Sequence, residues 1–135
     1  EQGYVLFAGD WKAGQWCSDA ALAPLGVTRD ESLVIDNIVG GCVGINLTNS
    51  TSKTFLSEWL RLAKDGTAFR GAWTNENHQV STDDRVLGHR HDQTVASVLA
   101  HRLGMTLTKR PKYFAYWSEN PAPETCLIAR GGCRE

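Results

Sequence analysis

Near the middle of the chain, an apolar run is followed directly by the pattern of an amphipathic helix. The run Gly41–Leu47 has apolar residues at successive rather than alternate positions, which is typical of a strand covered on both faces. We expect Ser52 to cap the next element. Beyond it, apolar residues recur at spacings of three and four, as on one face of a helix: Phe55, Leu56, Trp59, Leu60 and Ala63. A covered strand needs helices packed against it, so this order predicts a layered α/β or α+β fold.

The rest of the chain continues this alternation. Gly3–Ala8 and Tyr113–Trp117 are short runs of strand-forming residues, whereas Ser18–Leu22 predicts a short helix. Residues 92–103 predict a second amphipathic helix that ends at Gly104. Between the two long helices, the segment from Thr67 to Gly88 has no periodicity and predicts a long loop. We therefore expect an α/β fold in which helices flank a mixed sheet.

Size and charge limit the function. A chain of 135 residues with 41% hydrophobic and 21% charged residues is typical of one globular domain, so we treat residues 1–135 as a single domain. Its 14 basic and 15 acidic residues give a net charge of -1, which argues against a nucleic-acid partner. The longest apolar runs are too short to cross a membrane.

The densest group of polar side chains is the segment His89-Arg90-His91-Asp92-Gln93, which lies where the long loop meets the second helix. Unpaired N–H groups and the positive end of the helix dipole point outward at such a junction, where they favour phosphates and carboxylates. We expect Asp92 to cap this helix. The segment is therefore either a ligand-binding site or only a helix cap with two exposed histidines.

The pair His89 and His91 also allows a metal site. On an extended segment, side chains two residues apart point the same way. Catalytic zinc requires a third protein ligand, which His78, Asp83 or Asp84 would have to supply. On this alternative the protein is a small metal-dependent hydrolase.

Within the long loop, Trp73, Asn75 and Asn77 stand close together in a run of amide and aromatic side chains. Amides pair with hydroxyl groups and an indole can stack on the apolar face of a sugar, so these residues are candidates for carbohydrate binding. Half-buried aromatic residues are also common without any such role. We expect the loop Ala72–Asp84 to be mobile and to close over bound sugar.

Three of these segments, taken in order, resemble nucleotide-sugar glycosyltransferases of the GT-A type, in particular the glycogenin-like and lipopolysaccharide-galactosyltransferase-like groups. Gly40–Leu47 resembles the strand N-A-G-V-x-x-I-N-L of that family. His91-Asp92-Gln93 together with Ser97 resembles the family's helix start, H-D-Q-S-x-x-S. Tyr113–Trp117 resembles the strand that follows. The resemblance covers about residues 30–117 and implies a GT-A-like mixed sheet.

The resemblance implies roles for individual residues. Asp92 and Gln93 become the catalytic candidates, with Asp92 acting as a base or as a hydrogen-bond partner of reacting hydroxyls and Gln93 orienting the sugar. Gly41 lies beside them and lets the sugar approach the backbone. The other substrate-binding candidates come from the two polar segments described above: Trp73, Asn75, Asn77, His89, Arg90 and His91.

The departures from the family are equally informative. Thr94 replaces the family's second aspartate, Gly40 stands where an asparagine is common, and no D-x-D motif follows a strand. We therefore expect this chain to be the C-terminal half of a catalytic domain and to be inactive alone. The Mn²⁺ or Mg²⁺ ion expected in the full-length enzyme would have most of its ligands outside this chain, and so would the donor nucleotide.

The leading prediction is thus transfer of a sugar from a nucleotide-sugar donor to a carbohydrate or other hydroxyl acceptor. A carbohydrate-binding or scaffold domain that kept this fold without its catalysis is the first alternative, and the His-based hydrolase is the second. The compartment stays open between the cytoplasm and the Golgi lumen.

Overall fold

The computed structural model describes residues 2–110, 113–116 and 122–129. Its strands are β1 (Tyr4–Lys12), β2 (Asp36–Ile45), β3 (Phe114–Tyr116) and β4 (Leu127–Ala129). Its α-helices are α1 (Asp19–Leu25), α2 (Arg29–Ser32), α3 (Ser50–Asp65) and α4 (His91–Arg102), and short 3₁₀ turns lie at η1 (Ala13–Trp16), η2 (Thr67–Phe69) and η3 (Glu76–His78). This mixture of helices and strands confirms the predicted α/β class.

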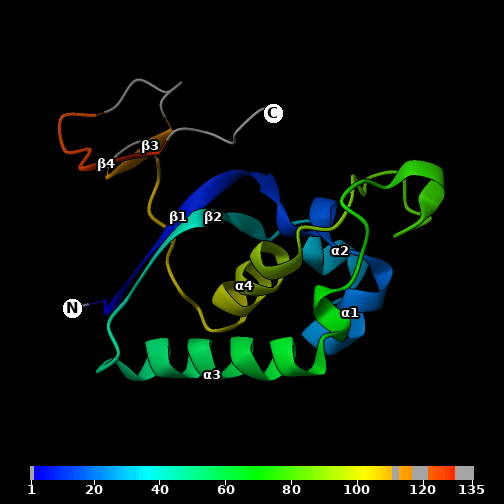
Figure 1. Ribbon diagram of the computed structural model, residues 1–135, viewed down its shortest axis with the longest axis horizontal. Helices are drawn as coiled ribbons and strands as arrows, with labels where there is room; N and C mark the ends of the chain where they lie inside the picture. Colours follow the sequence, from blue (N-terminus) through cyan, green and yellow to red (C-terminus); the bar gives the residue numbers. More distant parts are fainter. Residues whose placement is uncertain (1, 111–112, 117–121, 130–135) are drawn as a thin grey trace.

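The main body has three layers (Figure 1). The paired strands β1 and β2 lie on one side, α3 lies on the other, and α4 runs between them. The middle position of α4 explains why every residue from Thr94 to Ala100 is buried. The core that these layers share includes Leu6, Ile38, Phe55 and Val98. Burying such side chains stabilises the fold by about 1.5–3 kcal/mol each.

The pairing of β1 with β2 is antiparallel and contains a bulge. Leu6 pairs with Val43, whereas Ala8 pairs with Ile38. Between these two pairs, β1 has one residue, Phe7, and β2 has the four residues Val39–Cys42, so β2 bulges. A bulge of this kind bends the strand and redirects its side chains. Gly40 and Gly41 form the exposed part of the bulge, close to the first turn of α4.

The open edge of β2 is closed by side chains of α4 rather than by a strand. The Gln93 side-chain amide donates to the Ile38 carbonyl at 2.6 Å, and the Ile38 N–H donates to the Ser97 hydroxyl at 3.0 Å. One turn of helix thus satisfies both polar groups of a strand residue. This arrangement fixes the first turn of α4 against β2.

The N-caps of α3 and α4 both differ from those predicted from the sequence. The side chain of Asn49, rather than Ser52, caps α3, since it accepts a hydrogen bond from the Ser52 N–H, and Gly66 ends the helix in a left-handed conformation. The prediction that Asp92 caps α4 is wrong. Arg90 is the N-cap and uses no side-chain bond, and Asp92 lies inside the first turn.

The strand predicted as covered on both faces differs from the observed one. β2 begins earlier, at Asp36, and its buried part is Asn37–Val39, whereas Cys42–Ile45 is only half-buried. Among the described residues, the strands form two separate pairs, β1 with β2 and β3 parallel to β4. The larger GT-A-like mixed sheet stays a prediction.

Candidate functional site

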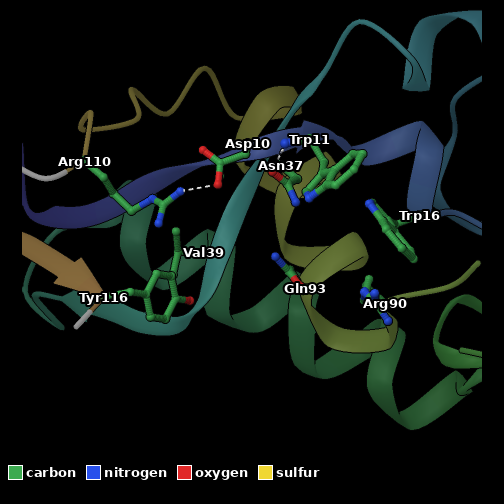
Figure 2. A pocket seen from close by; sticks show the side chains of 10 residues that line it. Asp10, Trp11, Trp16, Asn37, Val39, Arg90, Gln93, Arg110 and Tyr116 are labelled. Carbon is green, nitrogen blue, oxygen red and sulfur yellow. Dashed lines mark hydrogen bonds and ion pairs between the residues drawn. The ribbon is translucent and has the colours of Figure 1, made fainter. Parts of the chain in front are cut away.

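A pocket of about 240 Å³ opens where the C-terminal part of β1, the start of β2 and the first turn of α4 meet. Figure 2 shows the two ends of this pocket, with Asp10, Arg110 and Tyr116 at one and Trp11, Trp16 and Arg90 at the other. Between them lie two amide side chains. The full lining is Gly9, Asp10, Trp11, Trp16, Asn37, Val39, Arg90, Gln93, Arg110 and Tyr116.

The two amides, Asn37 and Gln93, are both fixed by backbone partners. The Asn37 side-chain oxygen accepts a hydrogen bond from the Trp11 N–H at 3.2 Å, and its NH₂ group remains on the pocket side. Gly9 makes this possible, because a Cβ there would lie 2.2 Å from that oxygen. Gln93 donates to the Ile38 carbonyl, which leaves its own oxygen to accept. The pocket therefore presents one fixed donor and one fixed acceptor.

The end near β3 holds an ion pair. Arg110 donates to the Asp10 carboxylate at 2.5 Å and to the Ala8 carbonyl at 3.2 Å, and its guanidinium carbon lies 5.2 Å from the centre of the Tyr116 ring. The Arg110 side chain is almost fully buried, whereas Asp10 is exposed. This end therefore offers a carboxylate in a fixed position.

The opposite end is built around Arg90. Its guanidinium carbon lies 3.7 Å from the centre of the Trp16 ring and 3.6 Å from that of Trp73. The Trp11 ring meets Trp16 edge-on at 5.7 Å. Among the described residues no acceptor pairs with the Arg90 guanidinium, and its Nη1 atom is buried without a partner. Burial lowers the pKa of Arg90, but an arginine keeps its charge in the physiological range.

His89 lies behind this end and does not reach the pocket. Its side chain is fully buried, and its Nδ1 atom accepts a hydrogen bond from the Ser18 N–H at 3.2 Å, so the ring hydrogen sits on Nε2. Burial lowers the pKa of His89 to about 4, with a smaller contribution from His91, and the Ala68 backbone opposes the shift. A neutral, enclosed ring supports the site but has no exposed surface to contact a substrate.

His91 connects the same region to the loop. Its Nε2 atom lies 3.1 Å from the Gly71 carbonyl, which can only accept, so this nitrogen carries hydrogen. The ring stacks on Trp73 at 5.8 Å and 21°. The backbone of His91 has a φ of 38°, a strained value for a residue with a side chain. Strain of this kind concentrates at functional sites.

The long loop is organised by Asn75. Its side-chain NH₂ donates to the Ser81 and Val86 carbonyls at 2.9 and 3.1 Å, and its oxygen accepts from the Val80 and Ser81 N–H groups. With those bonds made, the amide holds the loop together and is not free for a sugar. Asn77 lies on the exposed η3 turn with a φ of 55°, and it does not line the pocket. Closure of the loop over sugar stays a prediction.

Backbone hydrogen bonds and a closely packed glycine, Gly88, hold the loop against the start of α4. The His89 N–H donates to the Ala72 carbonyl and the Asn75 N–H donates to the Leu87 carbonyl, each at 2.9 Å. A Cβ at Gly88 would lie 2.1 Å from the Trp73 carbonyl oxygen. The close pairing of these segments sets where Trp73 meets Arg90.

The structure separates the two predicted catalytic residues. Gln93 lines the pocket, whereas Asp92 is exposed and lines an apolar groove against α3. Gly41 does not line the pocket, although a Cβ there would lie 3.9 Å from the Tyr116 hydroxyl. Among the predicted substrate-binding residues, Arg90 lines the pocket, and Trp73 and His91 pack beside it.

The sequence prediction missed the contribution of β1. Asp10 and Trp11 lie in the C-terminal part of β1, and Trp16 lies in the η1 turn that follows. Polar and aromatic residues at the end of an apolar strand are a signal for a site there. Asn37 and Arg110 gave no such signal, because they reach the pocket only through tertiary packing.

The alternative of a metal site built on His89 and His91 requires a third coordinating side chain nearby. The rings of His89 and His91 are 5.3 Å apart and nearly perpendicular. Within the described ranges, no three side chains of histidine, cysteine, aspartate or glutamate come together to hold a metal ion. Asp83, one of the possible third ligands, accepts a hydrogen bond from the Arg85 side chain instead. The hydrogen bonds from Arg85 lower the pKa of Asp83 to about 2.

Comparisons with protein families, with curated proteins and with solved structures find no match to this chain. The resemblance to glycosyltransferases therefore rests on the sequence segments alone. Across the part of the chain that the structure describes, no helix has the length and apolar character needed to cross a membrane.

Proposed function

We propose that this chain belongs to a nucleotide-sugar glycosyltransferase and that the pocket between β1, β2 and α4 binds one sugar unit. The observation that carries this proposal is the pair of anchored amides, Asn37 and Gln93, set beside the exposed Trp11 ring. The sugar would come from the donor or from the acceptor.

The chemistry of the lining suits a sugar. An amide donor and an amide acceptor in fixed positions match the hydroxyl groups of a ring, and a site built to pair with a hydroxyl rejects analogues that lack it. Trp11 is 49% exposed and offers an apolar surface at the rim. A volume of about 240 Å³ is just below the range of about 300–1,000 Å³ for drug-sized ligands, so we expect one ring rather than a whole nucleotide sugar to enter.

The geometry changes which carboxylate is the candidate for chemistry. Asp92 lies outside the pocket and so is not positioned to act on a ligand held by Gln93. Asp10 lines the pocket, where it can accept a hydrogen bond from a sugar hydroxyl. The described residues hold no group of three metal ligands, so the expected divalent cation would take most of its ligands from outside this chain.

A carbohydrate-binding domain without catalysis is the second candidate. The placement of Asp92 favours it, because the predicted base lies away from the bound sugar. Both candidates expect sugar binding in the pocket, and they differ in whether nucleotide sugar is consumed. Release of nucleotide from a nucleotide sugar, measured with and without acceptor sugars, separates them.

The binding test uses the tryptophan fluorescence of the 135-residue chain during titration with hexoses. We expect saturable binding that weakens at least tenfold in Gln93→Leu and in Trp11→Ala. Trp59→Ala is the matched control, because Trp59 lies on α3 in the apolar groove, and its sugar affinity should stay unchanged. If no monosaccharide binds, whether neutral or charged, or if Trp59→Ala weakens binding as much as Trp11→Ala, the pocket is not a sugar site.

A further inference from the structure

The geometry points to Arg90 as a carboxylate-binding residue, which makes an acidic sugar such as a hexuronic acid the ligand of this pocket. This inference rests on the proposed function and adds the charge of the sugar to it. Its evidence is the environment of the guanidinium, which differs from that of every other arginine near the pocket.

Arg90 is held by stacking rather than by hydrogen bonds. Its guanidinium carbon lies over the faces of Trp16 and Trp73 at 3.7 and 3.6 Å. Two rings cannot both lie so close on one side, so the group is enclosed between them. Cation–π contacts of this kind stabilise a charge that is partly removed from water, and they restrict its movement to the slot between the rings.

The N–H groups of Arg90 are unused. Stacking occupies the faces of a guanidinium and leaves its donors, which lie in its plane, available. Arg110 bonds Asp10, and Arg85 bonds Asp83 and Asp30, but none of the described residues accepts from Arg90. A buried donor without an acceptor is costly, and a ligand that supplies an acceptor removes that cost.

The shape of the slot favours a carboxylate. A planar carboxylate can meet a guanidinium edge with two parallel hydrogen bonds, and it fits between two flat rings. A tetrahedral phosphate would extend oxygens out of that plane. The small pocket volume also favours a group carried directly on a sugar ring.

The remaining lining fits the rest of such a ligand. Figure 2 places Arg90 at the end opposite Asp10, with Asn37 and Gln93 between them. A ring whose carboxylate meets Arg90 would therefore present its hydroxyls to the amides and to Asp10. Asp10 would repel a second acidic group, so the pocket discriminates the orientation of the ring.

The experiment compares matched sugars on the 135-residue chain by calorimetry: glucuronate with glucose, galacturonate with galactose, and inorganic phosphate alone. We expect at least one uronate to bind roughly 10- to 100-fold more tightly than its neutral hexose, as a charged hydrogen-bonded pair warrants. Arg90→Met keeps an apolar stem between the rings and should abolish this preference. Arg85→Gln, an exposed arginine outside the pocket, is the control and should keep the preference.

Arg90→Lys keeps a charge without the planar fork and should lose most of the preference, which gives a second test should Arg90→Met fold poorly. Equal affinity for uronates and hexoses would overturn the inference and leave the proposed function standing. A preference that survives Arg90→Met but disappears in Arg110→Gln would also overturn it, as would Arg90-dependent binding of phosphate that matches the uronates. If neither hexose nor uronate binds, the proposed function fails together with this inference.

Discussion

The first turn of α4 separates two hollows of different character. On its sheet side lies the pocket, which holds three charged side chains and two amides. On its other side lies the groove against α3, which Asp92 borders and which is otherwise apolar: Leu56, Trp59, Leu60, Ala63 and Phe69. The two hollows share one turn of helix, yet the pocket has five charged or amide side chains that can recognise a polar ligand and the groove has one, Asp92.

The comparison shows how a helix divides a sequence motif. Consecutive residues on an α-helix point about 100° apart, so Asp92 and Gln93 face different hollows although they are neighbours in the chain. A sequence motif at a helix start therefore indicates where a site lies, but it does not show which of its side chains face the same ligand. Here the partners of Gln93 come from β1 and β2.

The largest expected effect is a loss of folding stability, which should be greater for a glycine substitution beside the pocket than for one at the end of α3. Gly88→Ala places a Cβ against the Trp73 carbonyl, and we expect it to lower the free energy of unfolding by about 3 kcal/mol, the upper end for overpacking. Gly66→Ala, at the end of α3, meets no close atom but has a φ of 79°, which costs roughly 1–2 kcal/mol. Urea denaturation of both variants measures the difference, and equal losses would mean that the loop adapts to Gly88.

Acid should weaken the pocket side first. Because the pKa of His89 falls from 6.5 to about 4 on folding, the unfolded chain takes up the proton first as the pH drops below 6.5. The neutral ring thus contributes stability that is full above this pH and is lost towards pH 4, by about 3 kcal/mol. Hydrogen exchange at pH 7 and 4.5 should show residues 70–75 and 87–90 losing protection before α3. The same acid dependence of unfolding in His89→Gln would contradict this assignment.

The smallest expected effect on folding stability is the difference between substitutions of the neighbouring residues Gln93 and Asp92. Gln93→Ala removes the donor to the Ile38 carbonyl and should cost about 1–2 kcal/mol of folding stability as well as sugar affinity. Asp92→Ala removes an exposed carboxylate from the first turn and should cost no more than about 0.5 kcal/mol, its interaction with the helix dipole. Thermal melting of both variants decides. A sugar affinity that depends on Asp92 and not on Gln93 would reverse the roles of the two hollows.

Much of the framework was predictable from local patterns. The spacing of Phe55, Leu56 and Trp59 predicted α3, which buries one face. The pattern after Asp92 predicted the bounds of α4 to within a few residues, but its amphipathic character was predicted wrongly, because α4 is buried all round between two layers. The strand start at Asp36 was not predictable, since its edge is satisfied by Gln93 and Ser97 from far along the chain.

The site was predictable only in part. Arg90 and Gln93 were identified because a polar group at a helix start has a local signal. The enclosure of Arg90 by Trp16 and Trp73, and the burial of His89, depend on three chain segments that meet only in the folded protein. Asn75 illustrates the same limit: its amide suits a sugar in isolation, but in the fold it bonds the loop backbone.

The central claim is that the pocket, and not the α3 groove, recognises a sugar. Tryptophan side-chain N–H signals in NMR test this directly, since Trp11 and Trp16 line the pocket and Trp59 lines the groove. Titration with hexoses and uronates should shift the signals of Trp11 and Trp16 together with the side-chain amides of Asn37 and Gln93, and should leave Trp59 in place. Shifts confined to Trp59, or no shifts at saturating sugar, would contradict the account.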